Sequence, residues 1–443
     1  KLSSCFPSSP ETFNIRAAKP SKKSKMVPAT TKSKAPLILW SKMRLIAKTP
    51  QSKLARVNMF GMLFFIVQRL YSNITAYFMF RYGNNTSLCA MPKLGLFTFV
   101  IAFVSLTQLS AQNKYSNAFL EIGVDARAMA MGNNVVGHVN GAYAGYWNPA
   151  GITRMEGRMD FGLMHAEYFA GIANYDYLGA AYRLDEQSSV GLSIIRFGVD
   201  NILNTTRLID ENGNVDYDRI TKFSAADYGF LFSYSRQPEN IENLSWGANF
   251  KIVYRQIGDF ADAYGFGLDA GVQYHPGNWR LGATLKDVTT TVNAWTFNTE
   301  DFEDVFEQTG NELPQNGVEL TIPRLLLGGG YMFELGEKFT LLAEADMNFT
   351  FDGQRNSLIS SSAISGDIGA GVDVGFQDLI FLRGGISRFQ KVQDFDGSES
   401  MSVQPTVGIG VHFKMVTIDY ALTNIGNGLT DLYSNVFSVR VEI

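Results

Sequence analysis

Side chains that could carry out acid–base, nucleophilic or metal chemistry are sparse in this sequence. The four histidines, His138, His165, His275 and His412, are far apart along the chain. There is no HExxH zinc motif, GxSxG nucleophile turn, phosphate-binding loop or CxxC pair. Because no nucleophile lies next to a candidate base, a hydrolase or deacylase is not expected. We predict a protein that is not an enzyme, with no catalytic residue and no cofactor.

Acidic residues cluster at three places, and such clusters can bind Ca²⁺ when their oxygen ligands have a fixed spacing. The clusters are Glu300-Asp301, Glu303-Asp304 and the pair Asp394 and Asp396. None has the spacing of a calcium loop, so we interpret them as solvated acidic loops and predict no metal site.

Alternation of apolar and polar residues dominates the chain from residue 159 onwards. In the segment 264–275, tyrosine, phenylalanine, leucine and valine alternate with glycine, aspartate and glutamine. A period of two places the two sets on opposite faces of a strand. Strands that are apolar on one face and rich in glycine and charge on the other suit a wall between lipid and a polar interior. The pattern predicts an all-β fold, a transmembrane antiparallel β-barrel of a Gram-negative outer membrane.

We predict about fourteen strands, an even number as in bacterial barrels. Connections after even-numbered strands are short, such as 185–187, whereas those after odd-numbered strands are mostly long, notably 199–223 and 289–318. Short periplasmic turns and long outer loops alternate in this way when both chain ends are periplasmic. The predicted strands are 159–169, 174–184, 188–198, 224–236, 243–257, 261–275, 279–288, 319–334, 338–350, 364–376, 379–389, 404–413, 416–424 and 433–443.

The alternation also assigns strand residues to the lipid or to the lumen. Glycines on the lumen side leave room for an inserted segment or a ligand, or else permit strand bending. On the last strand, Val439 should face lipid and Ser438 the lumen, so an arginine should be destabilising at Val439 and much milder at Ser438. A lone inward histidine is more often a hydrogen-bonded wall residue than a reactive group. The candidate lumen-facing residues are Arg183, Arg280, Lys286, Arg383 and His412.

The start of the chain has a different composition. Residues 1–90 contain fifteen Lys and Arg and one acid, Glu11, whereas the rest contains 23 basic and 41 acidic residues. We interpret 1–90 as an upstream extension that is not part of the native protein and is disordered; a basic targeting extension is the alternative. Residues 91–111 have a short positive start, an apolar run and a small-residue cleavage site, which predicts a secretory signal peptide rather than a membrane helix.

Cleavage after Ala111 would leave 332 residues with a net charge of −19. Such a protein is a poor nucleic-acid binder. Residues 112–156 are rich in glycine and do not alternate, so we expect a hatch or plug segment inside or beneath the barrel 157–443. In this hatch segment, Asn148 is a good N-cap and Pro149 a good first helical residue, which predicts one helical turn there.

Two hatch motifs carry a family resemblance. They are Phe119-Leu120-x-x-Gly123-x-x-Ala126-Arg127-Ala128-x-Ala130-Met131-Gly132 and Tyr146-Trp147-Asn148-Pro149-Ala150-Gly151. With Asp287-Val288-Thr289-Thr290-Thr291-x-Asn293-Ala294-Trp295, they resemble the PorV/PorQ family, FadL-like fourteen-stranded outer-membrane barrels of Bacteroidetes. The resemblance covers 115–443 and implies that the hatch signature is structural. Its residues here are Arg127, Met131, Gly132, Trp147, Asn148, Pro149 and Gly151.

The resemblance also implies a role in type IX secretion and gliding. Partners would be a translocon barrel like SprA, secreted cargo, and the lipid and lipopolysaccharide of the outer membrane. A FadL-like transporter of hydrophobic small molecules, such as long-chain fatty acids, is the alternative function. A transporter should have an apolar pocket under its outer loops, whereas a secretion partner should expose apolar residues there.

The connection 289–318 could serve either function, as a lid or as a docking surface. It is rich in aromatic residues for a solvated loop. We predict that Trp295 and Phe297 pack on the barrel mouth and form a contact surface for a protein partner. The candidate residues are Trp295, Phe297, Phe302 and Phe306.

Overall fold

The computed structural model describes residues 116–443 except 170, 210–212, 300–302, 304–305, 307–309, 394–398 and 424–433. The expected extension, the signal peptide and Phe302 lie outside the described residues. Within the described part, no helix combines the length and the apolar character needed to cross a membrane. The described residues belong to one compact unit.

Fourteen strands pair side by side into a closed antiparallel ring, which confirms the predicted barrel. The ring closes where β1 pairs with β17, from Asp160 opposite Glu442 to Glu167 opposite Asn435. Closure leaves no open edge along this seam. The strands are β1 (Met159–Tyr168), β2 (Ala173–Arg183), β3 (Ser188–Asn204), β4 (Thr221–Arg236), β5 (Leu244–Ile257), β6 (Ala261–Tyr274), β7 (Trp279–Lys286), β10 (Arg324–Leu335), β11 (Phe339–Thr350), β13 (Ser365–Phe376), β14 (Ile380–Gln393), β15 (Glu399–Phe413), β16 (Val416–Thr423) and β17 (Ser434–Glu442).

Two further strands were not expected, β8 (Thr291–Phe297) and β12 (Ile359–Ser360), and a third, β9 (Gly317–Thr321), overlaps the start of the predicted strand 319–334. One part of β6 pairs with β7 and the other part pairs with β8, which in turn pairs with β9. The interpretation of 289–318 as a loop is therefore wrong over 291–297 and 317–318. The predicted strand 319–334 divides into β9 and β10 at Ile322-Pro323, because proline lacks the N–H that a continuous ladder needs.

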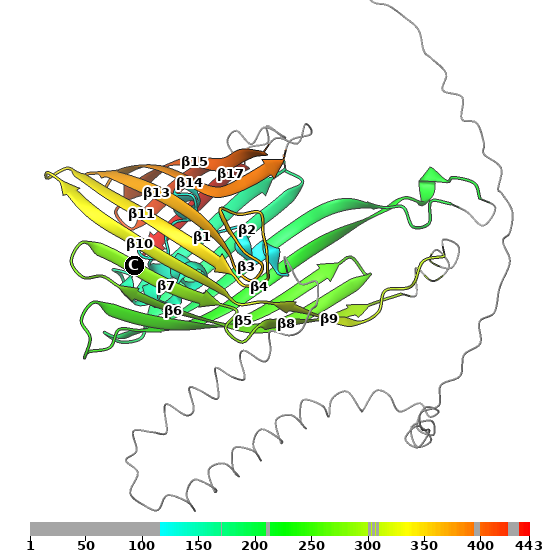
Figure 1. Ribbon diagram of the computed structural model, residues 1–443, viewed down its shortest axis with the longest axis horizontal. Coiled ribbons are helices and arrows are strands. Elements are labelled where there is room, and N and C mark those ends of the chain that lie inside the picture. The colour runs from blue at the N-terminus through cyan, green and yellow to red at the C-terminus, as the bar shows by residue number, and fades with distance from the viewer. Residues whose placement is uncertain are drawn as a thin grey trace, which may run out of the picture. The chain divides into compact units, whose positions relative to one another are not determined.

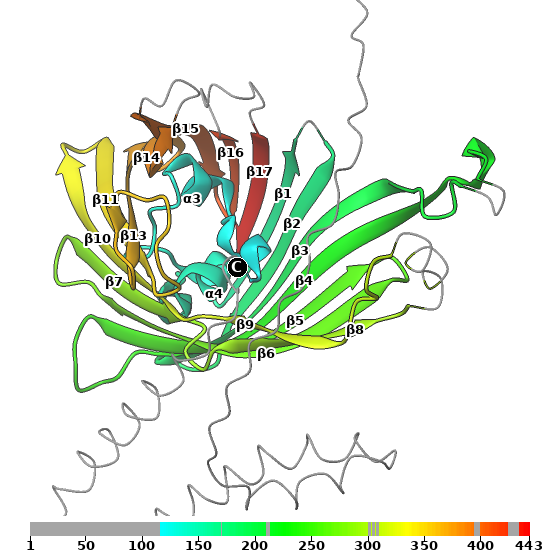
Figure 2. The same cartoon turned by 45° about the vertical axis from the view of Figure 1, so that its right-hand side comes forward.

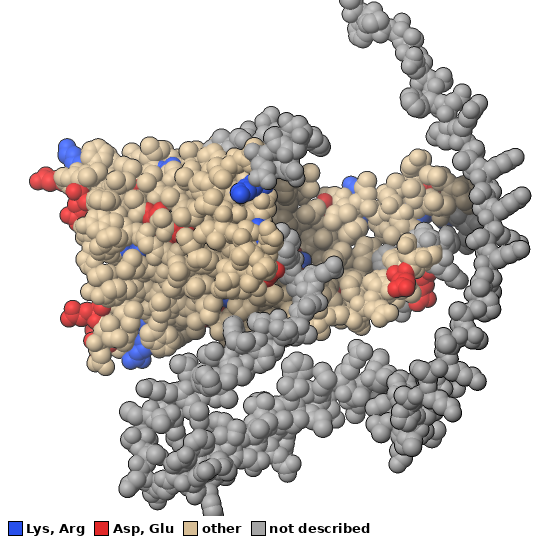
Figure 3. All heavy atoms as spheres, viewed as in Figure 1, with Lys and Arg blue, Asp and Glu red and all other residues tan. Residues whose placement is uncertain are grey.

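Exposure alternates along the wall as the sequence predicts. Phe232, Trp246 and Val407 are exposed on the outer surface, while their neighbours Ser233 and Ser245 face inward and are buried. Few charged side chains lie in the middle of the face shown in Figure 3, and most lie toward its ends. An apolar band between charged ends is the surface that a bilayer requires.

The connections sort by barrel end, also as predicted. Those between β2 and β3, β6 and β7, and β15 and β16 are short, and the start of β1 and the end of β17 lie at the same end. This end is periplasmic in bacterial barrels. Long connections, including one between β3 and β4 that holds the 3-10 helix η6 (Tyr217–Arg219), lie at the other end, which we call the outer end.

The hatch segment lies inside the ring of strands, as Figure 2 shows for α3 and α4. Wall glycines make room for it: a Cβ on Gly371 would come 2.4 Å from the carbonyl oxygen of Met131, and one on Gly271 would come 2.1 Å from Asn148 Oδ1. At these two positions the inward glycines therefore provide space for an inserted segment, which was one of the two expected roles. The helices are η3 (Ala118–Glu121), α3 (Ala126–Ala130), η4 (Gly141–Tyr143), α4 (Ala144–Trp147) and η5 (Pro149–Arg154).

One part of the wall projects beyond the rest. Strands β3 to β6, with β8 and β9, continue past the ends of β10 to β17 in both cartoon views (Figures 1 and 2). We call residues 199–225, 253–266 and 291–321 the flap. β3 has 17 residues and β4 has 16, whereas about 9–11 residues suffice to cross the hydrocarbon. The surplus length carries the flap beyond the membrane.

Candidate functional site: hatch, lumen and outer mouth

Helix α3 begins at a buried carboxylate and places Arg127 against the wall. Asp125 is the N-cap, and its carboxylate accepts a hydrogen bond from the Arg127 backbone N–H at 3.1 Å. The same carboxylate accepts the hydroxyl of Ser438. Burial, together with the charge of Asp419, raises the pKa of Asp125 to about 6.

The Arg127 side chain joins a buried ionic network on the wall. Its Nε donates to Asp373 at 2.9 Å, and Asp373 also pairs with Arg383 at 3.1 Å. Arg383 pairs in turn with Asp419 at 2.6 Å. Arg383 and both carboxylates are buried, so each charge depends on its partners for solvation. Arg383 thus lies in the lumen and connects three strands to the hatch.

Met131 and Gly132 form the turn after α3. Met131 is fully buried. Gly132 has φ +68°, and a Cβ there would come 3.1 Å from the Ile386 backbone nitrogen. Both the left-handed backbone and the close approach to the wall favour glycine at this position.

Tyr146 and Trp147 surround the end of a wall lysine. Their rings pack edge to face at 4.9 Å between centroids. Lys286 Nζ lies 4.1 Å from the Tyr146 ring centroid and 5.6 Å from that of Trp147. The lysine is buried, so the two faces supply the cation–π attraction that partly replaces water. Trp147 Nε1 also donates to the Val124 carbonyl at 2.9 Å, which ties the two hatch motifs together.

Asn148 starts the predicted helical turn and also bridges to the wall. Its Oδ1 accepts from the Ala150 N–H at 3.2 Å, and Pro149 is the first residue of η5. Its Nδ2 donates at 3.0 Å to the carbonyl of Val272 on β6. A Cβ on Gly151 would come 2.1 Å from the Val139 carbonyl oxygen. The turn is therefore packed closely against β6 and the rest of the hatch.

The other candidate lumen residues lie near the short turns. Arg183 donates to the Met155 carbonyl, and Arg280 donates to the Gly277 carbonyl at 2.8 Å. His412 Nε2 lies 2.7 Å from the Lys414 carbonyl oxygen. The structure thus brings Lys286 and Arg383 into the buried lumen, and it places Arg183, Arg280 and His412 at its periplasmic end.

Sequence reasoning missed a second hatch–wall cluster. His138 Nδ1 contacts Glu344 Oε2, whose other oxygen accepts from the Gly137 N–H at 2.7 Å. Asp346 accepts from the Val136 N–H at 3.0 Å. Burial and the charge of Arg127 hold the pKa of His138 well below its usual range. His138 and Glu344 are 206 residues apart in the sequence. No local sequence pattern could therefore have predicted that they meet.

The predicted partner loop contains part of the wall. Trp295 lies on β8, where its Nε1 donates to Glu319 at 2.8 Å and the Arg255 guanidinium lies 5.0 Å from its ring centroid. Phe297 stacks against Trp295 at 6.0 Å, and Phe306 is half-buried. The Trp295 indole N–H and ring therefore contact polar residues of neighbouring strands.

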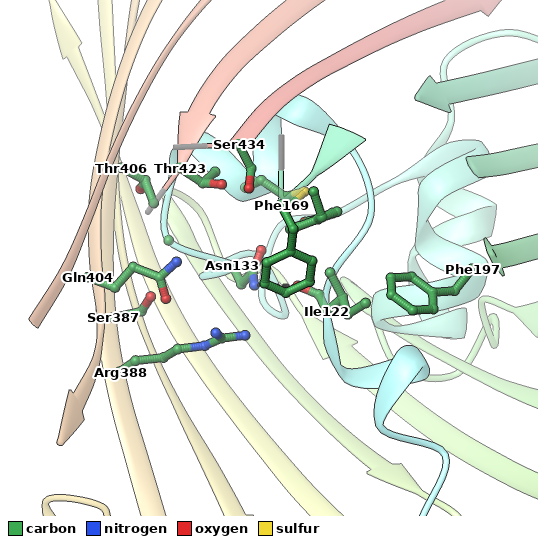
Figure 4. Close-up of a pocket in the computed structure, with 13 residues that line it drawn as sticks. Ile122, Asn133, Phe169, Phe197, Ser387, Arg388, Gln404, Thr406, Thr423 and Ser434 are labelled. Carbon is green, nitrogen blue, oxygen red and sulfur yellow. Dashed lines mark hydrogen bonds between the residues drawn. The ribbon is translucent and has the colours of Figure 1, made fainter. Parts of the chain in front are cut away.

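A cavity of about 370 Å³ lies between the hatch and the outer part of the wall (Figure 4). Ile122, Met129 and Asn133 of the hatch line one side, and Arg388 and Gln404 of the wall line another. Its size is at the lower end of the range for small-molecule pockets. Among the described residues, no group of three or more His, Cys, Asp or Glu could hold a metal ion. The remaining lining residues are Gly132, Tyr168, Phe169, Phe197, Ser387, Thr406, Thr423 and Ser434.

Solved barrels with a similar arrangement share little sequence with this chain. The monoaromatic hydrocarbon channel CymD has a TM-score of 0.47 and 14% identity, covering 73% of this chain and 98% of its own. The toluene transporter TodX of Pseudomonas putida has a TM-score of 0.44 and 15% identity, covering 72% of this chain and 96% of its own. A FadL homologue of Pseudomonas aeruginosa has a TM-score of 0.42 and 13% identity, covering 72% of this chain and 97% of its own. No curated relative matches the sequence.

A family model does match. Residues 110–228 fit the model described as "Type IX secretion system protein PorV". The matched region contains the hatch motifs and the strands β1 to β3 with part of β4. It therefore includes Arg127 and the Trp147–Gly151 turn, the residues that the sequence motifs single out. The chain is an outer-membrane β-barrel protein whose residues 110–228 are similar to PorV.

Proposed function

We propose that this barrel supports type IX protein secretion by binding protein partners at its flap. The observation that carries the proposal is a set of exposed apolar side chains at the far end of the β3–β4 hairpin. Leu203, Ile209 and Val215 are 58%, 59% and 53% exposed, and Tyr217 is 73% exposed. These residues lie beyond the strand length that lipid requires. An apolar patch in water is a mark of a protein interaction site.

The arrangement of the hatch supports a role through contacts. Ion pairs fasten it to the wall at Arg127–Asp373 and at Glu121–Arg324, and a hydrogen bond joins His138 to Glu344. A barrel whose lumen is occupied by a fastened segment acts on other proteins from its outer surface. The proposed partners are a translocon barrel like SprA and secreted cargo, and the proposed role is not enzymatic.

Substitution of the hairpin tip tests the proposal. We expect Ile209→Ser, Val215→Ser and Tyr217→Ser together to reduce recovery of the translocon barrel with the purified protein and to lower cargo display at the cell surface. The matched control is Leu184→Ser with Ile241→Ser, which removes side chains of 50% and 51% exposure at the periplasmic turns. Both variants should remain heat-modifiable barrels. Normal partner recovery with the tip variant would refute the flap as the docking surface.

A second candidate function is transport of a hydrophobic small molecule, and the outer cavity favours it. Its lining includes Ile122, Met129, Phe169 and Phe197. Transport would require the hatch ion pairs to open. Deleting residues 299–315, which spares β8 and β9, separates the two functions. Loss of partner recovery with unchanged uptake of a hydrophobic solute supports secretion; the reverse result supports a transporter lid.

A further inference from the structure

The outer cavity has an apolar side and a polar side. The apolar side is formed by Phe169, Phe197 and Ile122. The Phe169 side chain is 58% exposed. Ser387, Arg388 and Gln404 lie opposite, from β14 and β15, as Figure 4 shows. A ligand that fits both sides must itself be amphipathic.

Arg388 supplies a positive charge at the cavity, and it interacts with the Asp367 carboxylate without forming a direct ion pair. Its guanidinium has no ion pair within the described part of the chain, and its side chain extends from the wall toward Asn133 (Figure 4). The β14–β15 register is broken between Ser387 and Gln390. A bulge of this kind re-aims a side chain, here into the cavity.

Backbone strain is concentrated at the same cavity. Arg388 has φ +53° and Phe169 has φ +54°, and both line it. A left-handed conformation is unfavourable for large side chains. Strain of this kind is often kept at ligand sites, where it positions a side chain. Of the two strained residues, Arg388 is the charged residue of the lining and Phe169 is its most exposed aromatic residue.

Two polar atoms at the cavity lack partners. Asn133 Oδ1 and Thr423 Oγ1 are buried, and neither forms a hydrogen bond within the described residues. The amide orientation of Asn133 follows from its Nδ2, which donates to the Ile122 carbonyl at 3.1 Å. Oδ1 is therefore an acceptor that needs a donor, and an aliphatic carboxylate ion has none to offer. A ligand N–H or O–H would satisfy it.

We propose that this cavity binds a small amphipathic carboxylate that carries a hydrogen-bond donor beside the charge, as an N-acylated amino acid does. Arg388 binds the carboxylate, Asn133 accepts the adjacent N–H, and Phe169 and Phe197 contact the apolar group. The inference does not depend on the proposed secretion function, because it concerns the cavity above the hatch and not the flap.

Titration calorimetry of the full barrel in lipid nanodiscs tests the ligand class. The probe is N-acetyl-L-phenylalanine, and we expect saturable binding with one site. Its primary amide lacks the anion and should bind at least tenfold more weakly. The compound 3-phenylpropionate keeps the anion and ring but lacks the N–H, and should bind several-fold more weakly. Equal binding of all three compounds, or no binding of the probe, would overturn the proposal.

Variants assign the binding to the cavity. Arg388→Gln should weaken N-acetyl-L-phenylalanine at least tenfold and leave its amide unaffected. Asn133→Leu should remove the advantage over 3-phenylpropionate. Lys222→Gln, which removes an exposed cation from β4 outside the cavity, is the control and should change nothing. Heat modifiability shows whether each variant is folded. A folded Arg388→Gln barrel that binds as the wild type does would refute the site.

A last arm identifies the source of the carboxylate. A tetrapeptide that ends in phenylalanine presents the same group at the end of a longer chain. Binding of both the tetrapeptide and the free acylated amino acid would indicate a cavity open enough for a peptide end. Binding of the free compound alone would indicate a dedicated small-molecule site. Binding of the tetrapeptide alone would contradict the proposal as stated.

Discussion

At the scale of single residues, charges inside this barrel act in pairs that fasten the hatch to the wall. Arg127 reaches Asp373 of β13, and Arg440 of β17 pairs with Asp160 of β1 at 2.6 Å. The Arg440 guanidinium also contacts Asn140 of the hatch at 2.6 Å. Buried pairs contribute little compared with an apolar replacement, but loss of one partner leaves the other charge uncompensated. Each pair is therefore a sensitive point for mutation.

Replacing Asp373 with asparagine should lower the free energy of unfolding by about 3 kcal/mol, since it leaves Arg127 and Arg383 short of a buried counter-charge. The control is Asp176→Asn on β2, where the carboxylate is 41% exposed beside Arg196 and His165. That change should cost less than about 1 kcal/mol. Urea unfolding in detergent micelles, followed by heat modifiability, measures both. Equal effects would mean that the network is not structural.

The raised pKa of Asp125 predicts a pH dependence with a definite sign. The pKa is about 6 in the folded protein against an ordinary value of 3.8, so the folded state holds the proton more tightly. Its contribution to stability is full below pH 4 and is lost as the pH rises through 6. Relative to Asp125→Asn, the wild type should lose on the order of 2–3 kcal/mol between pH 4 and pH 7. A difference independent of pH would contradict this assignment.

At the scale of elements, each strand has one face against lipid and one against the hatch. The face against the hatch tolerates substitutions less well. The expectation that an arginine would be mild at Ser438 is wrong. Ser438 is 2% exposed, and its hydroxyl accepts from the Ala126 N–H at 3.1 Å. Lumen positions under the hatch are packed like a protein core, so a large charged side chain has no space there.

The lipid face of β17 can be tested by depth. Val439→Arg should lower the free energy of unfolding by about 2–4 kcal/mol if the residue lies near the bilayer midplane. Ile443→Arg, at the exposed periplasmic end of the chain, should cost about 0–1 kcal/mol. Unfolding in lipid vesicles measures both. Similar costs at the two positions would show that the depth assignment of β17 is wrong.

At the scale of the whole molecule, the barrel is a wall around an inserted segment, with a flap on one side of its mouth. The hatch contributes much of the buried apolar core, including Val124, Met131 and Ile152, and wall residues such as Tyr175 and Tyr177 pack with it. The lumen is thus a hydrophobic core as well as a polar one. We expect these contents, more than the wall alone, to decide whether the barrel conducts.

Planar bilayer recording checks this consequence. We expect the intact protein to show no steady pore conductance, because the hatch occupies the lumen. Removal of residues 116–154, before the first strand, should open a conducting pore in a barrel that still resists denaturation without heating. A conducting intact protein would show that the hatch does not block the lumen. A silent, folded deletion variant would show that wall side chains alone close it.

The sequence determined the wall of this protein, because period-two alternation is a local property that a strand inherits residue by residue. Fourteen strands, their turns and their outward faces follow from it. The hatch motifs were also visible, since a cap such as Asn148 with Pro149 satisfies local backbone groups. The splitting of 319–334 could be anticipated at Pro323, yet the pairing of β6 with both β7 and β8 could not.

Tertiary structure alone decided which residues meet across the lumen. Arg127 and Asp373 are 246 residues apart, and Asp125 and Ser438 are 313 apart. Their contacts exist only because the ring closes between β1 and β17 around the hatch. The cavity at Arg388 has the same origin, because a hatch turn, the outer end of β1 and a bulge in β14 line it together. Closure brings distant segments together through geometry that no short stretch of sequence encodes.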